Sequence, residues 1–144
     1  RFGRFEGDHM DNQAALGAVA LYTALNIVVL YALAIQTGRL RMRHKILMGD
    51  GGHPRMIRVM RGHANAIETM PMTLLALALA ALLGAAPWTI HGLGLALTVG
   101  RALHAIHFMA ADAPRWQRGV GFGLTALAMA LAGLYAGILG IMAL

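Results

Sequence analysis

The chain has 144 residues, of which 58% are hydrophobic and only 12% are charged, and its formal net charge is +6. Soluble globular domains carry roughly 25% charged residues, so this composition excludes an ordinary soluble domain and indicates a protein embedded in lipid. The sequence has no cysteine, which excludes disulfides, thiolate nucleophiles and zinc sites of the cysteine type. The basic residues lie mostly between apolar runs, a distribution that predicts contact with lipid headgroups and not with nucleic acid.

The chain begins with a polar, aperiodic segment, residues 1–9, and His9–Met10 is typical of a cloning junction. We therefore expect residues 1–9 to be a tag remnant and residues 10–144 to form a single membrane domain with four spans. Four apolar runs follow, and each is long enough to cross ~30 Å of hydrocarbon as a helix. They predict helices over about 12–38, 54–85, 88–111 and 115–143. The predicted fold class is all-α, an integral membrane four-helix bundle.

The connections between these runs differ sharply in charge. The first, residues 38–63, holds the basic residues Arg39, Arg41, Arg43, Lys45, Arg55, Arg58 and Arg61. The second is a tight turn over residues 84–87, and the third, residues 112–119, holds Arg115 and Arg118. Because basic loops stay in the cytoplasm, we expect a multi-pass protein of the cell inner membrane, with loops one and three cytoplasmic and both termini on the opposite side.

Four polar residues lie on one face at the start of the second predicted helix. Arg58, Arg61, Asn65 and Glu68 fall within an arc of ~80° at about 100° per residue. A charged side chain at membrane depth opposes insertion by at least ~2.5 kcal/mol, so Glu68 is expected to be paired or to face a polar space. One interpretation is a polar lining, continued by Arg101 in the third helix. The alternative is a buried ion pair that joins helices of one bundle.

The third predicted helix holds a second polar group. Arg101 and His104 are one helical turn apart, and His107 follows at the same spacing. Two histidines at this spacing form half of a metal site, but no carboxylate or cysteine accompanies them, so we expect no bound metal. In the fourth helix, Gly133 and Gly137 have the spacing that lets helices approach closely in lipid, either within the bundle or between subunits.

The second helix resembles the MAPEG family, membrane-associated proteins in eicosanoid and glutathione metabolism. The family pattern R-x-x-R-x-x-x-N-x-x-E-x-x-P is matched at every fixed position from Arg58 to Pro71. Arg101 and His104, followed by Phe108, resemble the family's second segment. Family members are four-helix bundles that assemble as homotrimers and hold glutathione in a cavity between adjacent subunits, so the resemblance implies the same for this chain.

The resemblance also implies roles for individual residues. Those expected to bind glutathione are Arg39, Arg58, Arg61, His63, Asn65, Glu68 and His104. Arginine pairs with carboxylates through bidentate hydrogen bonds, and Glu68 would accept the ammonium group of glutathione. An arginine near the start of the fourth helix, either Arg115 or Arg118, is expected to stabilise the thiolate by lowering the pKa of the glutathione thiol.

Two positions depart from the family pattern, because many members have tyrosine where this chain has Thr69 and Phe108. His104 is expected to replace one of the lost contacts. The implied function is that of a membrane-bound glutathione transferase or peroxidase of the microbial branch. Glutathione is then the co-substrate, its thiolate attacks hydrophobic small molecules, and no metal takes part. The alternative is a non-catalytic membrane protein that binds a lipid headgroup or another anion in a basic groove between subunits.

Overall fold

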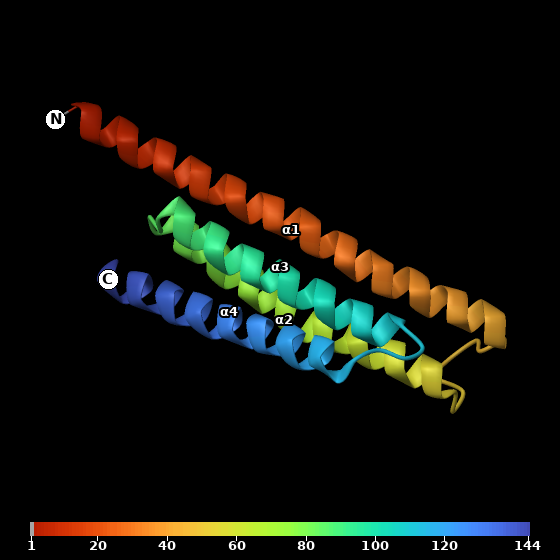
Figure 1. The fold of residues 1–144 in the computed structure, drawn as a ribbon. Helices are drawn as coiled ribbons and strands as arrows, with labels where there is room; N and C mark the ends of the chain where they lie inside the picture. The colour runs from red at the N-terminus through yellow and green to blue at the C-terminus, as the bar shows by residue number, and fades with distance from the viewer. Residues whose placement is uncertain (1) are drawn as a thin grey trace.

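The computed structural model describes the backbone of residues 2–144 and the side chains of residues 10–144. It contains the helices α1 (Phe2–His44), α2 (Pro54–Leu82), α3 (Pro87–Met109) and α4 (Arg115–Met142), and no strand occurs in residues 2–144. The helices alternate in direction, and both chain ends lie at the same end of the bundle (Figure 1). The prediction of an all-α four-helix protein is confirmed. The side chains of residues 1–9 lie outside the described part of the chain, so the expectation that these residues are a tag remnant stays a prediction.

α1 is longer than predicted and ends at His44 rather than near residue 38. Its last turn is basic, and cations are favourable beside the carbonyl end of a helix. The chain then leaves the helix at Lys45, which has a φ of 55°. The basic residues from Arg39 to Arg43 therefore lie on α1, and the first connection covers only residues 45–53.

Prolines and a glycine set the ends of the central helices. α2 begins at Pro54 and α3 at Pro87, because proline has the φ of a first helical turn and its missing N–H is not needed there. α2 ends at Leu82, slightly before the predicted end near residue 85. The turn that follows places Gly84 at a φ of 87°, a conformation that disfavours residues with a Cβ.

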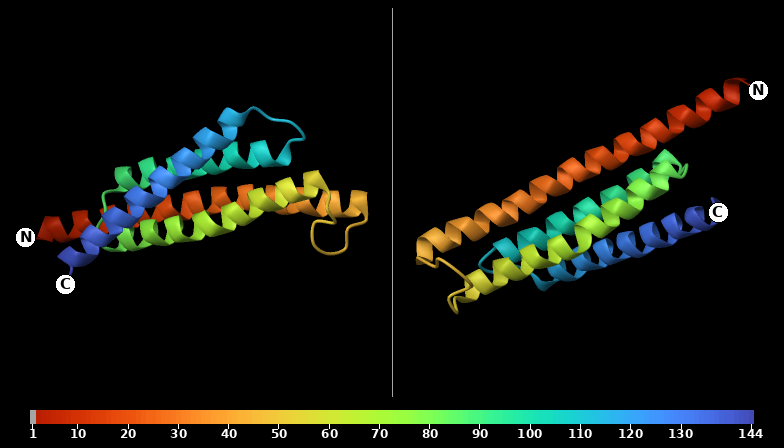
Figure 2. Two further views of the ribbon diagram at one scale, coloured as in Figure 1. Left: turned by 90° about the horizontal axis from the view of Figure 1, so that it is seen from below. Right: turned by 180° about the vertical axis from the view of Figure 1, so that it is seen from behind.

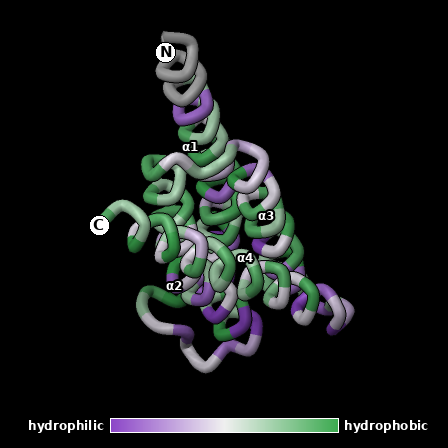
Figure 3. Tube along the Cα trace, turned by 90° about the vertical axis from the view of Figure 1, so that its left-hand side faces the viewer, coloured by the Kyte–Doolittle hydropathy of each residue, from purple (hydrophilic) through white to green (hydrophobic). Residues whose placement is uncertain are grey.

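The outer surface of the bundle is apolar, as lipid requires. Large hydrophobic side chains point outward, with Val28 66% and Leu134 62% exposed. By length and composition, α1, α2 and α4 can each cross a membrane, whereas the hydropathy of α3 is lowered by Arg101 and three histidines. Arg101, His104 and His107 are buried, so α3 turns these polar groups inward. Figure 3 shows hydrophobic residues along most of the helical trace.

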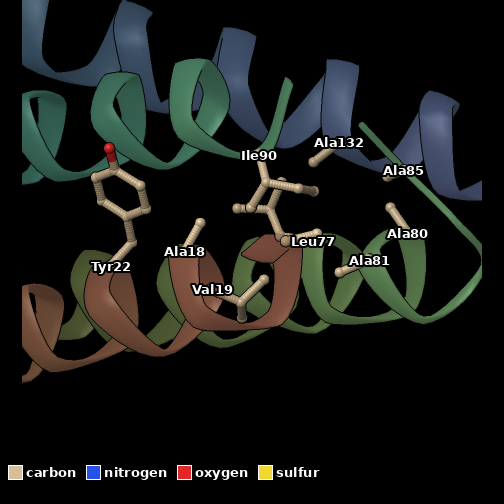
Figure 4. Close-up of a cluster of buried hydrophobic side chains, with 10 residues drawn as sticks. Ala18, Val19, Tyr22, Leu77, Ala80, Ala81, Ala85, Ile90 and Ala132 are labelled. Carbon is tan, nitrogen blue, oxygen red and sulfur yellow. The ribbon is translucent and has the colours of Figure 1, made fainter. Parts of the chain in front are cut away.

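α2 and α3 form the centre of the bundle. α1 and α4 each pack against both of them, and α1 does not contact α4 in the described chain (Figures 1 and 2). One buried apolar cluster lies near the chain ends, where Leu77 and Ile90 lie against each other and Tyr22 belongs to the α1 side of the cluster (Figure 4). A second cluster, around Leu33 and Val59, includes no residue of α4. The start of α4 is therefore not sealed against α2 by apolar side chains.

α3 and α4 approach closely at a pair of glycines. A Cβ on Gly121 would lie 2.7 Å from the backbone nitrogen of His104 and 2.8 Å from the carbonyl oxygen of Gly100. A Cβ on Gly100 would lie equally close, 2.8 Å, to the carbonyl oxygen of Gly121. The atoms in the way are backbone, so neither position has room for a side chain. This approach brings Thr125 of α4 within hydrogen-bond distance of Arg101.

Replacing Gly121 with alanine is expected to lower the stability of the detergent-solubilised protein by about 1–3 kcal/mol, the usual effect of overpacking a core. Thermal unfolding followed by circular dichroism measures the change. Gly92→Ala on α3 is the matched control, because a Cβ there meets nothing within 4 Å. Alanine is the better helix former, so the control should be at least as stable as the wild type. Similar stability of the two variants would contradict the close contact.

Candidate binding cavity

A cavity of about 780 Å³ lies between the first half of α2, the end of α3 and the start of α4. Small-molecule sites typically have volumes of ~300–1,000 Å³. The lining residues are Arg58, Arg61, Ala64, Asn65 and Glu68 of α2, His104, His107 and Phe108 of α3, Asp112 and Ala113 of the next turn, and Arg115, Arg118, Gly119 and Phe122 of α4. Four arginines and two carboxylates share the cavity, so its charge favours an anionic ligand that also carries a cationic group.

The polar stripe predicted on α2 lines this cavity along its length. Arg58, Arg61, Asn65 and Glu68 all belong to the lining. Arg61 and Glu68 are exposed in the single chain, and Glu68 forms no ion pair with any residue from 10 to 144. The interpretation of the stripe as a lining therefore fits the structure, whereas the alternative, an ion pair that joins helices of one bundle, does not form within residues 10–144.

Arg58 is only partly available to a ligand. Its Nε and Nη2 donate to the carbonyl oxygen of His107 at 3.3 and 2.7 Å. Arg55 likewise donates to the carbonyl oxygen of Met109 at 3.1 Å. These carbonyl groups belong to the last turn of α3, where no following helical N–H satisfies them. Both arginines therefore fasten α2 to the end of α3, and only Nη1 of Arg58 remains for a ligand.

His107 has both ring nitrogens occupied. Nδ1 lies 3.1 Å from the carbonyl oxygen of Pro114, which can only accept, so Nδ1 carries the proton. Nε2 then accepts from Nη2 of Arg58 at 3.0 Å. The ring joins the end of α3 to the residue before α4 and leaves neither nitrogen for a metal ion. His107 is thus used in contacts that join helices, and its spacing from His104 does not form a metal site here.

Phe108 holds two arginines at the cavity wall. The guanidinium carbons of Arg58 and Arg118 each lie 5.9 Å from its ring centroid, within the range of cation–π attraction. The ring of His104 stacks beside it, with 4.6 Å between centroids. Gly62 makes room on α2, because a Cβ there would lie 2.6 Å from the Cβ of Phe108. Phe108 lacks the hydroxyl of the expected tyrosine, but it positions cationic groups instead.

The other predicted residues fall into two groups. His104, Arg115 and Arg118 line the cavity, so both candidates for thiolate stabilisation are present there. Arg39 and His63 do not line it. Arg39 is exposed near the end of α1, and His63 is half-buried on another face of α2. A single chain therefore assembles only part of the predicted set.

Three further residues of interest, Asp112, Phe122 and Thr125, were not predicted from the sequence. Asp112 and Phe122 line the cavity, and neither carries a sequence signal, because only the fold of the α3–α4 turn brings them there. Thr125 is fully buried in α4 and accepts a hydrogen bond from Arg101. It carries no sequence signal either, because a threonine hydroxyl in a helix can bond to the carbonyl oxygen four residues earlier, as Thr125 does to Gly121.

Arg58→Ala is expected to lower the stability of the protein by about 1.5–3 kcal/mol, because hydrogen bonds from a charged donor contribute that much. Thermal unfolding in detergent measures the loss. Arg61→Ala is the control, since Arg61 is exposed on the same face and forms no hydrogen bond within residues 10–144. Its effect should stay within about 0.5 kcal/mol. A comparable loss from Arg61→Ala would show that both arginines support the fold.

Comparison with known proteins agrees with the resemblance that the motif of α2 indicates. The model of the MAPEG family matches residues 19–138, a stretch that contains every residue lining the cavity. The chain is also similar to two curated proteins, both described as inner membrane protein YecN, from Escherichia coli strains K12 and CFT073. Each is 33% identical over 89 residues, which cover 62% of this chain and 68% of the relative.

Proposed function

The chain belongs to the MAPEG family, and from this premise we propose that it binds glutathione in the cavity and transfers it to lipophilic electrophiles. The observation that supports this best is the composition of the cavity wall on α2. Arg61 and Glu68 face the cavity without a partner in residues 10–144, and Asn65 lies between them. An arginine and a carboxylate without partners in a membrane-embedded helix favour a ligand that carries both a negative and a positive group.

Glutathione meets that requirement, because it has two carboxylates and one ammonium group. Arg61 can pair with a carboxylate through a bidentate hydrogen bond, and Glu68 can accept the ammonium. Glu68 is seven positions after Arg61 on α2, about 10 Å along the helix axis. An extended tripeptide also spans about 10 Å, so one molecule reaches both groups.

Arg115 and Arg118 supply the cationic surroundings for the thiol. A guanidinium beside a thiol lowers the thiol pKa and raises the fraction of reactive thiolate. In the transfer, the thiolate sulfur bonds to the electrophilic carbon, the leaving group departs with its electron pair, and the thiol proton passes to solvent. Phe108 and Phe122 offer apolar surface for the lipophilic electrophile.

A homotrimer would complete the site, with a neighbouring subunit supplying Arg39 and His63. Two features support this assembly. Arg61 and Glu68 are exposed in the single chain, although they belong to a membrane-embedded helix. α4 also carries an outward row of glycines, at which an added Cβ would meet nothing within 4 Å: Gly123, Gly133 and Gly137. Rows of small residues let helices of different subunits approach closely in lipid.

The proposed location is the inner membrane, because the similar E. coli proteins are described as inner membrane proteins. The basic ends of the helices would face the cytoplasm, and both termini the opposite side. The cavity lies at the basic end, so it would open toward the cytosolic glutathione pool.

Purified protein is expected to conjugate glutathione to chlorodinitrobenzene faster than the uncatalysed reaction. Arg115→Gln and Arg118→Gln then identify the stabilising cation. Without that cation the thiol pKa rises, so the rate–pH profile of one variant should move to higher pH. The other variant should keep the wild-type profile and serves as the matched control.

No conjugation, together with no glutathione binding by calorimetry, would contradict the proposed function. A phospholipid retained in native mass spectra, which glutathione cannot displace, would then favour a non-catalytic anion site. The excess of arginines over carboxylates in the cavity suits that second candidate.

Chains carrying Arg61→Ala and chains carrying Arg39→Ala are expected to complement each other. Alone, each variant should lose most of its glutathione transfer, because every site lacks one arginine. In mixed trimers, some sites combine Arg61 of one chain with Arg39 of another, so coexpression should restore part of the activity.

The control pairs Arg61→Ala with Glu68→Ala, since both residues lie on the same wall of one chain. Every site in that mixture lacks one of them, and no activity should return. Native mass spectrometry confirms that both chains share an assembly. Inactive mixed trimers of the first pair would contradict a site shared between subunits.

A further inference from the structure

Arg101 occupies a position that packing does not explain. Its side chain is 1% exposed within α3, and no carboxylate contacts it among residues 10–144. A guanidinium is strongly disfavoured in hydrocarbon unless it is hydrogen-bonded or serves a polar site. Its Nη2 is buried and has no hydrogen-bond partner in the described chain. An apolar residue would fill this space more favourably, so the guanidinium indicates a function.

Asn65 separates Arg101 from the cavity. Asn65 belongs to the cavity lining, and Arg101 does not. Oδ1 of Asn65 accepts a hydrogen bond from Nη1 of Arg101 at 2.8 Å. A guanidinium has donors and no acceptors, so the amide oxygen and not the amide NH2 must face it. The NH2 group of Asn65 makes no hydrogen bond within residues 10–144 and is left for the cavity.

Two threonines hold the guanidinium in this orientation. Thr69 accepts from Nη1 at 3.3 Å and donates to the carbonyl oxygen of Asn65 at 2.8 Å. Thr125 accepts from Nε at 2.7 Å and donates to the carbonyl oxygen of Gly121 at 2.9 Å. Arg101 is thus fixed from α2 and from α4. Thr69 does not line the cavity, so its hydroxyl supports Arg101 and does not contact a ligand there.

We propose that Arg101 is a positioning residue that locks Asn65 with its amide NH2 toward the cavity. The Asn65 subsite then takes a hydrogen-bond acceptor, a carboxylate or carbonyl oxygen of the bound peptide, and rejects a donor. This specificity rests on the proposed function, with glutathione as the ligand. Arg101 itself touches no ligand, and its effect on binding passes through Asn65.

Asn65→Asp tests the orientation without breaking the network. The new carboxylate still accepts from Arg101, so the melting temperature should be equal to or above that of the wild type. The cavity now meets an oxygen in place of an NH2 group, and glutathione affinity measured by calorimetry should fall about tenfold or more. Unchanged affinity would overturn the proposal, because the NH2 group would then not be used.

A double-mutant cycle tests whether Arg101 acts through Asn65. Arg101→Gln and Asn65→Ala should each weaken glutathione binding, and the double variant should bind no worse than Asn65→Ala alone. Additive losses would overturn the proposal. Asn26→Ala is the matched control, since Asn26 also bonds across helices, to Thr98 of α3, and does not line the cavity. It should lower the melting temperature but change affinity by less than about twofold.

A measurement without ligand keeps this inference separate from the proposed function. The chain has three asparagines, Asn12, Asn26 and Asn65, so isotope-labelled asparagine gives few side-chain amide signals by NMR. The NH2 group of Asn26 donates to Tyr22 and Thr98, both at 2.8 Å, and should exchange slowly with water. The NH2 group of Asn65 should exchange faster, because it faces the cavity.

Arg101→Gln should shift the signal of Asn65 and leave that of Asn26 in place. An unchanged signal of Asn65 would overturn the proposal even if glutathione binds. Conversely, a wild-type protein that fails to bind glutathione, but shows the expected NMR changes, would contradict the proposed function and retain Arg101 as the residue that orients Asn65.

Discussion

The hydrogen bonds of one buried guanidinium join three of the four helices. Arg101 on α3 donates to Asn65 and Thr69 of α2 and to Thr125 of α4. In hydrocarbon each unsatisfied polar group costs several kcal/mol, so an arginine at this depth requires neighbouring helices to bring their oxygens to it. Those contacts form in only one rotation of α2 about its axis, the one that turns Asn65 and Thr69 toward α3. The same rotation turns the polar stripe of α2 toward the cavity.

Backbone packing sets the shape of the space that the stripe faces. The contact between Gly100 and Gly121 brings α4 close to α3, and the apolar cluster around Leu33 and Val59 excludes α4. The start of α4 therefore lies against α3 without being sealed to α2. Arg58 of α2 bonds to the carbonyl oxygen of His107, and the ring of His107 bonds to Pro114. The end of α3 is therefore joined both to α2 and to the residue before α4. The cavity forms because α3 and α4 pack closely together, whereas the start of α4 has no buried apolar contact with α2 in the described chain.

Thr69 and Phe108 take on different tasks from the tyrosines common at their positions in the family. Thr69 turns its hydroxyl inward, where it accepts from Arg101, and Phe108 lies between the guanidinium groups of Arg58 and Arg118. Phe108 thus holds two cationic groups at the cavity wall, Thr69 supports Arg101, and neither residue offers a hydroxyl to a ligand there. The proposed site relies on arginines, one carboxylate and one oriented amide, and its completion from Arg39 and His63 would need a neighbouring subunit.

The sequence by itself determined the four helices, the membrane environment, the family motif and the one-sided stripe from Arg58 to Glu68. Hydrophobic run length and helical periodicity are local properties, so they can be read without knowing the fold. The tertiary structure decided which polar groups are already used. Arg58 bonds to His107, His107 bonds to Pro114, and the amide oxygen of Asn65 accepts from Arg101. Hydrogen-bond partners from different helices depend on helix rotation and approach, which packing of the whole bundle sets and no single segment encodes.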